Sequence, residues 1–134
     1  NRTLTPERTQ KDVSRALILA SSALKNLILK YPHLGQAWAS FSLTQLALGN
    51  VVESRLSASI ATLLAPEAIE SWVSWVCCEL QEIHGIKNSN GTVNQSRITE
   101  VRNYMRQIEA MSVLYTMLRV VWVDICQFAS EVLK

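Results

Sequence analysis

One short pattern occurs twice in the chain, at an interval of 34 residues. Pro32 lies six positions before Trp38, Pro66 lies six positions before Trp72, and both the prolines and the tryptophans are 34 residues apart. A fixed interval of this length is typical of repeat proteins, in which each unit packs mainly against its neighbours. The interval therefore predicts a stack of similar units, and it constrains the fold more than any other feature of the chain.

Residues that interrupt helices are few, and they fall where helices are expected to end. The chain has only four glycines and three prolines. Pro6 suits the first position of a helix, Pro32 and Pro66 each end one, and Gly49-Asn50 is a typical helix stop. Between these points the apolar residues keep helical spacing. The sequence therefore predicts an all-α fold.

A length of 134 residues suits one domain. We expect the first ten residues to be flexible and residues 11–134 to form a single helical domain. Its predicted parts are a helix over 11–30, a helix hairpin over 35–68, a further helix over 69–85, a Gly/Asn-rich loop over 86–96 and a long helix over 97–133.

The long C-terminal helix carries an apolar stripe with spacings of three and four. The stripe includes Ile108, Met111, Tyr115, Leu118, Trp122 and Ile125. Such a stripe is heptad-like, but beyond Glu109 the helix is apolar nearly all round, which predicts burial on several sides. Two alternatives remain: a break near Ser112 into two helices, and pairing of the 97–134 stripe with a second copy of the chain.

The segment 35–68 resembles one unit of the tetratricopeptide repeat (TPR) family along its whole length. In this alignment Trp38 is at the fourth position of the motif, Gly49 is at the turn between the two helices, and Pro66 is at the thirty-second position. Gln45 departs from the family, which prefers an aromatic residue there, and Ser54 stands where the family prefers alanine.

The flanking segments resemble partial TPR units. Residues 11–30 are similar to a half repeat, and residues 69–85 to the first helix of a third repeat. The resemblance implies antiparallel hairpins stacked as a short right-handed superhelix, with the C-terminal helix as a cap. It also implies that one set of residues packs between the helices: Trp38, Phe41, Ser42, Gly49, Ser54, Ala58, Ala61, Pro66, Trp72 and Trp75.

TPR proteins bind partners in a concave groove lined by the first helix of each unit. The corresponding positions here are Gln36, Ala39, Leu43, Leu46, Ala47, Glu70, Val73, Cys77, Leu80 and Gln81. None of them is basic, so the carboxylate clamp of chaperone-binding members does not carry over. An apolar groove suits a helical segment of another protein, or residues 110–132 of the chain itself. The alternative is that these residues are simply core.

Composition limits the other classes of function. Hydrophobic residues make up 49% of the chain and charged residues 18%, which leaves apolar surface for a partner. A net charge of +2 argues against nucleic-acid binding, although residues 1–30 are basic and residues 67–82 are acidic. The most apolar stretch contains Arg119 and Asp124 near its middle, so no membrane span is expected.

The three cysteines suggest reduced thiols and an intracellular protein, cytoplasmic or nuclear. Asn-x-Ser/Thr triplets begin at Asn1, Asn90 and Asn94, but such triplets are common in polar loops.

Catalytic and cofactor motifs are not apparent. Cys77 and His84 are two helical turns apart, too far to share a metal without a ligand between them. We expect no enzyme activity, no cofactor and no metal. The expected function is a non-enzymatic scaffold or adaptor within a multiprotein complex, with structural homo-oligomerisation as the alternative.

Overall fold

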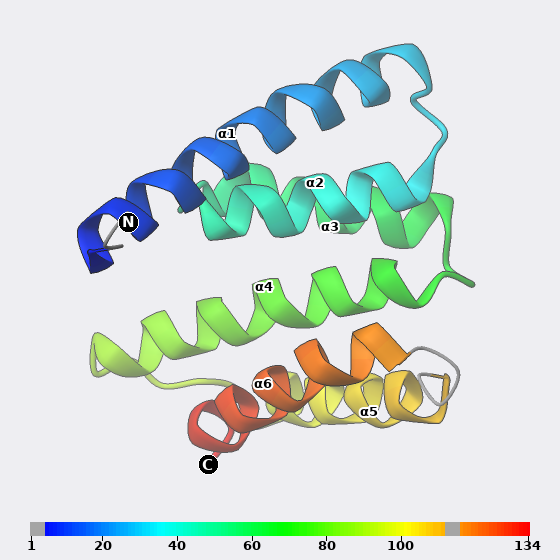
Figure 1. Cartoon of the computed structure of the whole chain (residues 1–134). Helices are drawn as coiled ribbons and strands as arrows, with labels where there is room; N and C mark the ends of the chain where they lie inside the picture. Colours follow the sequence, from blue (N-terminus) through cyan, green and yellow to red (C-terminus); the bar gives the residue numbers. More distant parts are fainter. Residues whose placement is uncertain (1–4, 112–115) are drawn as a thin grey trace.

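The computed structural model of the chain describes residues 5–111 and 116–134, with the side chains of 116–118 left aside. The described part consists of helices joined by turns and short loops, without strands, as Figure 1 shows. The helices are α1 (Pro6–Lys30), α2 (Gly35–Ala47), α3 (Val51–Leu64), α4 (Ile69–Asn88), α5 (Gln95–Met111) and α6 (Thr116–Val132). The prediction of an all-α fold is confirmed.

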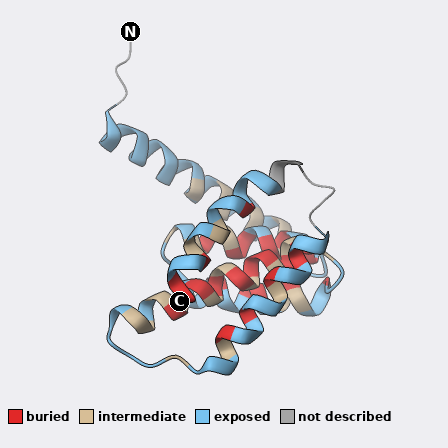
Figure 2. Cartoon of the chain, turned by 90° about the horizontal axis from the view of Figure 1, so that it is seen from below, coloured by how far each residue is buried: buried red, intermediate tan, exposed pale blue. Residues whose placement is uncertain are grey.

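Helix α1 begins at Pro6, the residue that the sequence places at the first position of a helix. The Thr5 hydroxyl accepts a hydrogen bond from the Arg8 backbone N–H at 3.2 Å and caps this end. Residues 6–10 of the segment expected to be flexible are therefore the first part of α1, and residues 1–4 lie outside the described part. All residues of α1 up to Ala16 are exposed, and Figure 2 shows this half of the helix projecting from the body.

A tight reversal joins α2 to α3 at Gly49, whose φ of +86° is costly for other residues. The Asn50 backbone N–H donates to the Gln45 carbonyl at 2.9 Å, which closes the turn. Ser42, Ser54, Ala58 and Ala61 are all buried where the hairpin helices meet. Small side chains there let the two helices approach closely.

Helix α4 runs past its predicted end at residue 85 and stops at Asn88. Asn90 adopts a φ of +58°, its N–H donates to Lys87 at 3.1 Å, and the Gly91 N–H donates to Ile86 at 2.8 Å. This is a Schellman stop, with asparagine in the left-handed position. The Asn94 side chain then caps the next helix by accepting from the Ser96 N–H at 3.0 Å, so the predicted loop over 86–96 shortens to residues 89–94.

The predicted single helix over 97–133 is wrong, because the chain forms two helices there, α5 and α6. An unbroken helix would carry its apolar second half away from the body. By turning back, α6 buries Trp122, Ala129 and Val132 against the core that α4 and α5 share. Residues 112–115, which separate the two helices in the sequence, lie outside the described part.

The stripe predicted on the long helix is divided between α5 and α6. Ile108 and Trp122 are buried in the core and Ile125 packs against it, whereas Met111 is 41% exposed. The side chains of Tyr115 and Leu118 lie outside the described part. The described members Ile108 and Trp122 are therefore part of the core that α4, α5 and α6 share, and are not available to pair with a second copy.

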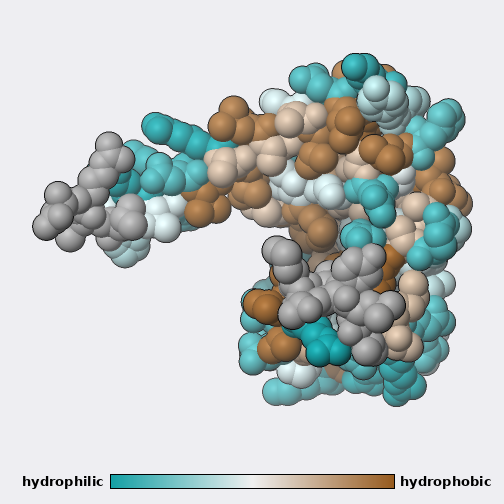
Figure 3. All heavy atoms as spheres, turned by 45° about the vertical axis from the view of Figure 1, so that its right-hand side comes forward, coloured by the Kyte–Doolittle hydropathy of each residue, from teal (hydrophilic) through white to brown (hydrophobic). Residues whose placement is uncertain are grey.

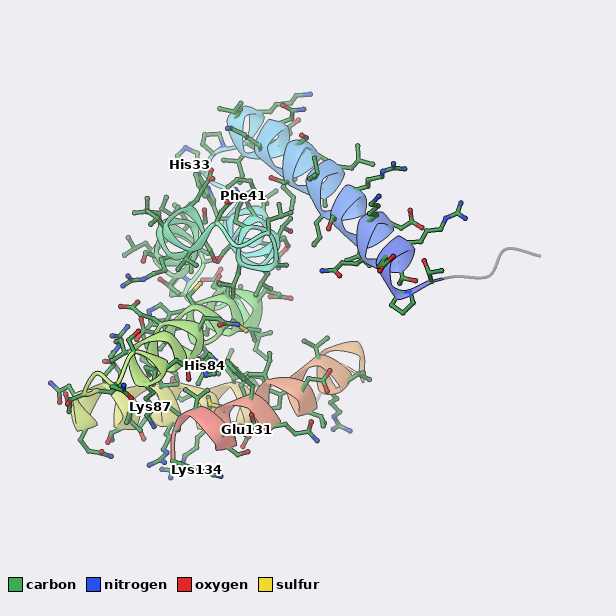
Figure 4. All side chains as sticks on the ribbon, turned by 90° about the vertical axis from the view of Figure 1, so that its left-hand side faces the viewer. His33, Phe41, His84, Lys87, Glu131 and Lys134 are labelled. Atoms are coloured by element: carbon green, nitrogen blue, oxygen red, sulfur yellow. The ribbon has the colours of Figure 1, made fainter. Side chains whose placement is uncertain are left out.

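Figure 4 looks nearly along α2 and α3, which lie side by side. Helix α1 crosses above them, and α4, α5 and α6 lie below. Helix α2 packs against α1, α3 and α4, and α4 packs against α2, α3, α5 and α6. The end of α6 is tied down by Lys87, whose ammonium donates to the Val132 carbonyl and, at 3.0 Å, to that of Lys134.

Candidate functional site

The two halves of the sequence repeat make the same contact in the structure. The indole N–H of Trp38 donates to the Pro32 carbonyl at 2.9 Å, and that of Trp72 donates to the Pro66 carbonyl at 2.7 Å. In each case a tryptophan near the start of one helix binds the backbone just after the preceding helix. The repeat interval therefore corresponds to an equivalent structural junction, first between α1 and α2 and then between α3 and α4.

An aromatic cluster joins the second junction to α5. The rings of Trp72 and Tyr104 stack at 4.7 Å with 9° between their planes, and Trp75 meets Tyr104 edge-on at 4.9 Å. These geometries are favourable for aromatic pairs and hold α5 against α4. Trp72 and Trp75 thus pack between helices, as the sequence predicts.

A buried polar cluster lies where α2, α3 and α4 meet. The Ser54 hydroxyl donates to the Ser42 carbonyl at 2.7 Å, and the Ser42 hydroxyl donates to the Ser54 carbonyl at 2.8 Å. The Cys78 sulfur lies 3.1 Å from the Ser54 hydroxyl oxygen. The hydroxyl and thiol groups satisfy one another, so this cluster fixes the packing of three helices and leaves no group facing solvent.

Gln45, which departs from the TPR pattern, also has a structural role. Its side chain is buried, accepts a hydrogen bond from the Ser21 hydroxyl at 3.0 Å and donates to the Glu53 carboxylate at 2.7 Å. It therefore links α1, α2 and α3 through polar contacts where the family would place an aromatic ring.

Two carboxylates of α4, those of Glu79 and Glu82, pair with arginines. The Arg97 guanidinium contacts Glu79 at 2.7 Å and Glu82 at 3.0 Å, and Arg55 of α3 contacts Glu82 at 2.9 Å. The hydrogen bond to Glu79, with a further bond to Glu82, raises the pKa of Arg97 above its usual value although partial burial opposes this. The acidic stretch seen in the sequence is thus partly used to join α3, α4 and α5.

The predicted groove residues do not form one continuous accessible surface. Ala39, Val73 and Leu80 are buried, so they are core residues and the prediction that they line an open groove is wrong. Val73 and Leu80 belong to the cluster that α6 covers. The other seven predicted positions are exposed or half-buried: Gln36, Leu43, Leu46, Ala47, Glu70, Cys77 and Gln81.

What stays accessible is a strip along α2. At about 100° per residue, one arc of this helix carries the exposed or half-buried residues Gln36, Ser40, Leu43, Thr44 and Ala47. We refer to these five residues as the α2 strip. Figure 4 shows the projecting part of α1 and the first half of α6 extending on the same side of α2 and α4, and Figure 3 shows the hollow beneath α1.

An exposed apolar face on α3 was not predicted from the sequence. Val52, Leu56 and Leu63 are 75%, 62% and 81% exposed. Their spacings of four and seven place them on one side of the helix. The spacing is visible in the sequence, but it resembles that of a buried stripe, and only the structure shows that this side of α3 faces outward.

The cysteines show no sign of activation. Burial, together with the neighbouring Cys78, raises the pKa of the Cys77 thiol to about 12, and burial beside Glu109 raises the pKa of Cys126. Raised values disfavour the reactive thiolate. Among the described residues no group of three or more His, Cys, Asp and Glu side chains could hold a metal ion, and no described helix is long and apolar enough to cross a membrane.

Comparison of the chain with protein-family models, with curated proteins and with solved structures gives no match.

Proposed function

We propose that the protein is a non-enzymatic, TPR-like scaffold that holds a helical or apolar segment of another protein against the α2 strip. The observation that carries the proposal is the repeated junction, in which Trp38 and Trp72 bind the carbonyls of Pro32 and Pro66 at equivalent places. Because both the 34-residue interval and the tryptophan–carbonyl hydrogen bond recur, a repeat protein is favoured. Repeat proteins commonly bind partners through extended concave surfaces.

The packing of the helices supports a repeat stack. The first helix of each proposed unit, α2 and then α4, contacts both its own partner helix and the preceding hairpin or half-hairpin. Gly35 allows a close junction, because a Cβ atom there would lie 2.5 Å from the Cβ of Ala65. Close approach of this kind is what stacked hairpins need.

The chemistry of the α2 strip favours an apolar ligand. Helix α2 has no charged residue, and Leu43 is the largest apolar side chain of the strip. A partner would therefore gain free energy mainly from burial of Leu43 and its neighbours, at roughly 25 cal/mol per Å² before the costs of association. The free cysteines support an intracellular location for such a scaffold.

Quantitative affinity capture tests this function. The wild-type chain is compared with Leu43→Arg, which places a charge in the α2 strip, and with Leu19→Arg, a matched change at a 72% exposed leucine of α1. We expect one or more proteins to be recovered with the wild type and with Leu19→Arg, and at least about tenfold less with Leu43→Arg. Equal recovery by all three chains would exclude the α2 strip as the binding surface.

A further inference from the structure

The exposed face of α3 is suited to pair with a copy of itself. Val52, Leu56, Ser59 and Leu63 all point away from the buried side of α3, within about 60° of one another around the helix axis. Among the described residues, Leu63 is the most exposed large hydrophobic one, at 81%. We refer to these four residues as the α3 face.

The α3 face carries no charge that would oppose an apolar contact. The charged residues of α3 are Glu53 and Arg55, and both are engaged within the chain. Glu53 accepts from the Gln45 amide at 2.7 Å, and Arg55 forms an ion pair with Glu82 at 2.9 Å. No member of the α3 face is charged, and the Glu53 carboxylate beside it keeps its hydrogen bond to the Gln45 amide.

A protruding side chain and a hollow lie at opposite ends of this face. Leu63 protrudes near the end of α3, and a shallow hollow of about 600 Å³ lies beside Val52 and Leu56 near its start. Its other lining residues are Gly49, Asn50, Val51 and Glu53. Residues 52 and 63 are eleven positions apart, which is about three helical turns and about 16 Å along the same side of the helix.

A two-fold axis places each protruding leucine in the partner's hollow. In an antiparallel pair of α3 helices centred between residues 57 and 58, position 63 of one copy faces position 52 of the other. Leu56 then faces Ser59, whose small side chain leaves room for the leucine. Such self-complementarity is what a two-fold interface requires.

We propose that two copies of the chain associate through an antiparallel pair of α3 helices, with Leu63 of each copy seated beside Val52 and Leu56 of the other. This inference does not depend on the α2 strip, because the α3 face lies on the opposite side of α3 from Ser54, Ala58 and Ala61, which are buried where α3 meets α2. A dimer formed in this way leaves both α2 strips open.

The expected dimer is a weak one. Stable interfaces bury about 800 Å² on each partner, and a single helix face about 21 Å long offers less than that. The dissociation constant should therefore lie in the micromolar range. Sedimentation equilibrium between about 10 and 500 µM covers this range, and a wild-type chain that stays monomeric throughout it would overturn the proposal.

Two matched substitutions locate the interface. Leu63→Glu should weaken dimerisation at least about 30-fold, because a carboxylate would enter both hollows. Leu29→Glu changes a leucine of α1 that is 74% exposed and should leave the dissociation constant within about threefold of wild type. Circular dichroism checks that both variants fold. A dimer that survives Leu63→Glu, or that is lost with Leu29→Glu, contradicts an interface at α3.

A mixing experiment tests the antiparallel register. Leu63→Glu and Val52→Lys should each be largely monomeric alone, but an equal mixture should form a heterodimer in which Glu at position 63 faces Lys at position 52. The other end of the same pair keeps the native contact of Val52 with Leu63. Failure of the mixture to associate more strongly than either variant alone would overturn the antiparallel arrangement.

Discussion

The two glycines Gly35 and Gly85 lie in opposite surroundings, one crowded and one open. A Cβ at Gly35 would lie 2.5 Å from the Cβ of Ala65, whereas a Cβ at Gly85 would meet nothing within 4 Å. We expect Gly35→Ala to lower the free energy of unfolding by about 1–3 kcal/mol through overpacking. Gly85→Ala lies inside α4 and should raise it by about 0.5–1 kcal/mol.

Urea unfolding followed by circular dichroism measures both effects. Both variants add one methyl group. Changes of opposite sign in the free energy of unfolding would therefore be due to the close junction at Gly35. Equal effects in both variants would mean that α2 and the end of α3 do not approach one another as described.

Cys77 gives a pH dependence whose sign follows from its surroundings. Burial raises the pKa of its thiol from 9.0 to about 12, so the folded chain holds the neutral thiol more strongly than the unfolded chain does. This contribution to stability is fully present below pH 9 and is lost progressively as the pH rises from 9 to about 12. Lysines and tyrosines also titrate in this range, so the useful quantity is a difference between variants.

Replacing Cys77 by alanine removes the titrating group. Relative to wild type, Cys77→Ala should show a shallower decline in the free energy of unfolding above pH 9, measured by urea unfolding at several pH values. In the wild-type chain at pH 8, alkylation of Cys77 should be slower in the folded than in the unfolded state. Identical slopes for the two chains would show that the thiol is not held neutral by folding.

The structural roles of single residues were predicted most reliably where the residue type suits only one kind of position. Gly49 and Pro66 follow from turn and helix-end chemistry, and buried Ala58 lies at a position where the TPR resemblance implies packing between helices. Ala39 was misplaced because a small residue fits a groove wall and a helix contact equally well. Its burial depends on which helices lie beside α2, which local sequence does not encode.

The two halves of helix α1 differ in how they pack against the rest of the chain. Its second half packs against α2 through Leu24, Leu27 and Ile28, while all residues from Pro6 to Ala16 are exposed. Helices of about a dozen residues are marginal in water without tertiary packing. Amide hydrogen exchange should therefore be fast over residues 6–16 and at least about 100-fold slower over residues 24–30.

Mass spectrometry of peptic fragments can resolve these two halves. Exchange measured at low and high protein concentration also separates intrinsic fraying from protection by association. Comparable protection of both halves at low concentration would show that contacts within the chain cover the first half.

Helix ends were predictable where a proline or glycine stops the helix, and not where the end depends on contacts between distant segments. Pro32 and Pro66 are followed by new helices as expected, but no glycine or proline marks the change from α5 to α6. The chain turns there because Trp122 and Ala129 gain burial against α4, a contact between distant segments. A periodic apolar stripe is compatible with one long helix or with two that pack on the same core.

The described part of the molecule has two apolar clusters of unequal size. One lies between α4, α5 and α6 and includes Leu80, Ile83 and Ile108, and a smaller one joins α1 to α2 through Ile28 and Phe41. The interval of 34 residues predicts a stack of units and carries no information on this imbalance. It arises because α6 adds a third helix to one end, while at the other end α1 packs on α2 only through its second half.

Unequal clusters should make stability uneven along the stack. In repeat proteins, stability is approximately a sum of terms within units and between neighbours. Ile28→Ala should release α1 and lower its amide protection while leaving α4 to α6 little changed. Ile83→Ala, at a fully buried position of the larger cluster, should cost about 2–5 kcal/mol and lower protection in every helix from α2 to α6.

Hydrogen exchange of the two variants, compared helix by helix with wild type, distinguishes a stack from a single cooperative core. A change confined to α1 in Ile28→Ala, with a general change in Ile83→Ala, is the pattern expected for neighbours coupled in sequence. If Ile28→Ala lowers protection equally in α1 and α6, the two clusters unfold as one unit, and the nearest-neighbour description does not apply to this chain.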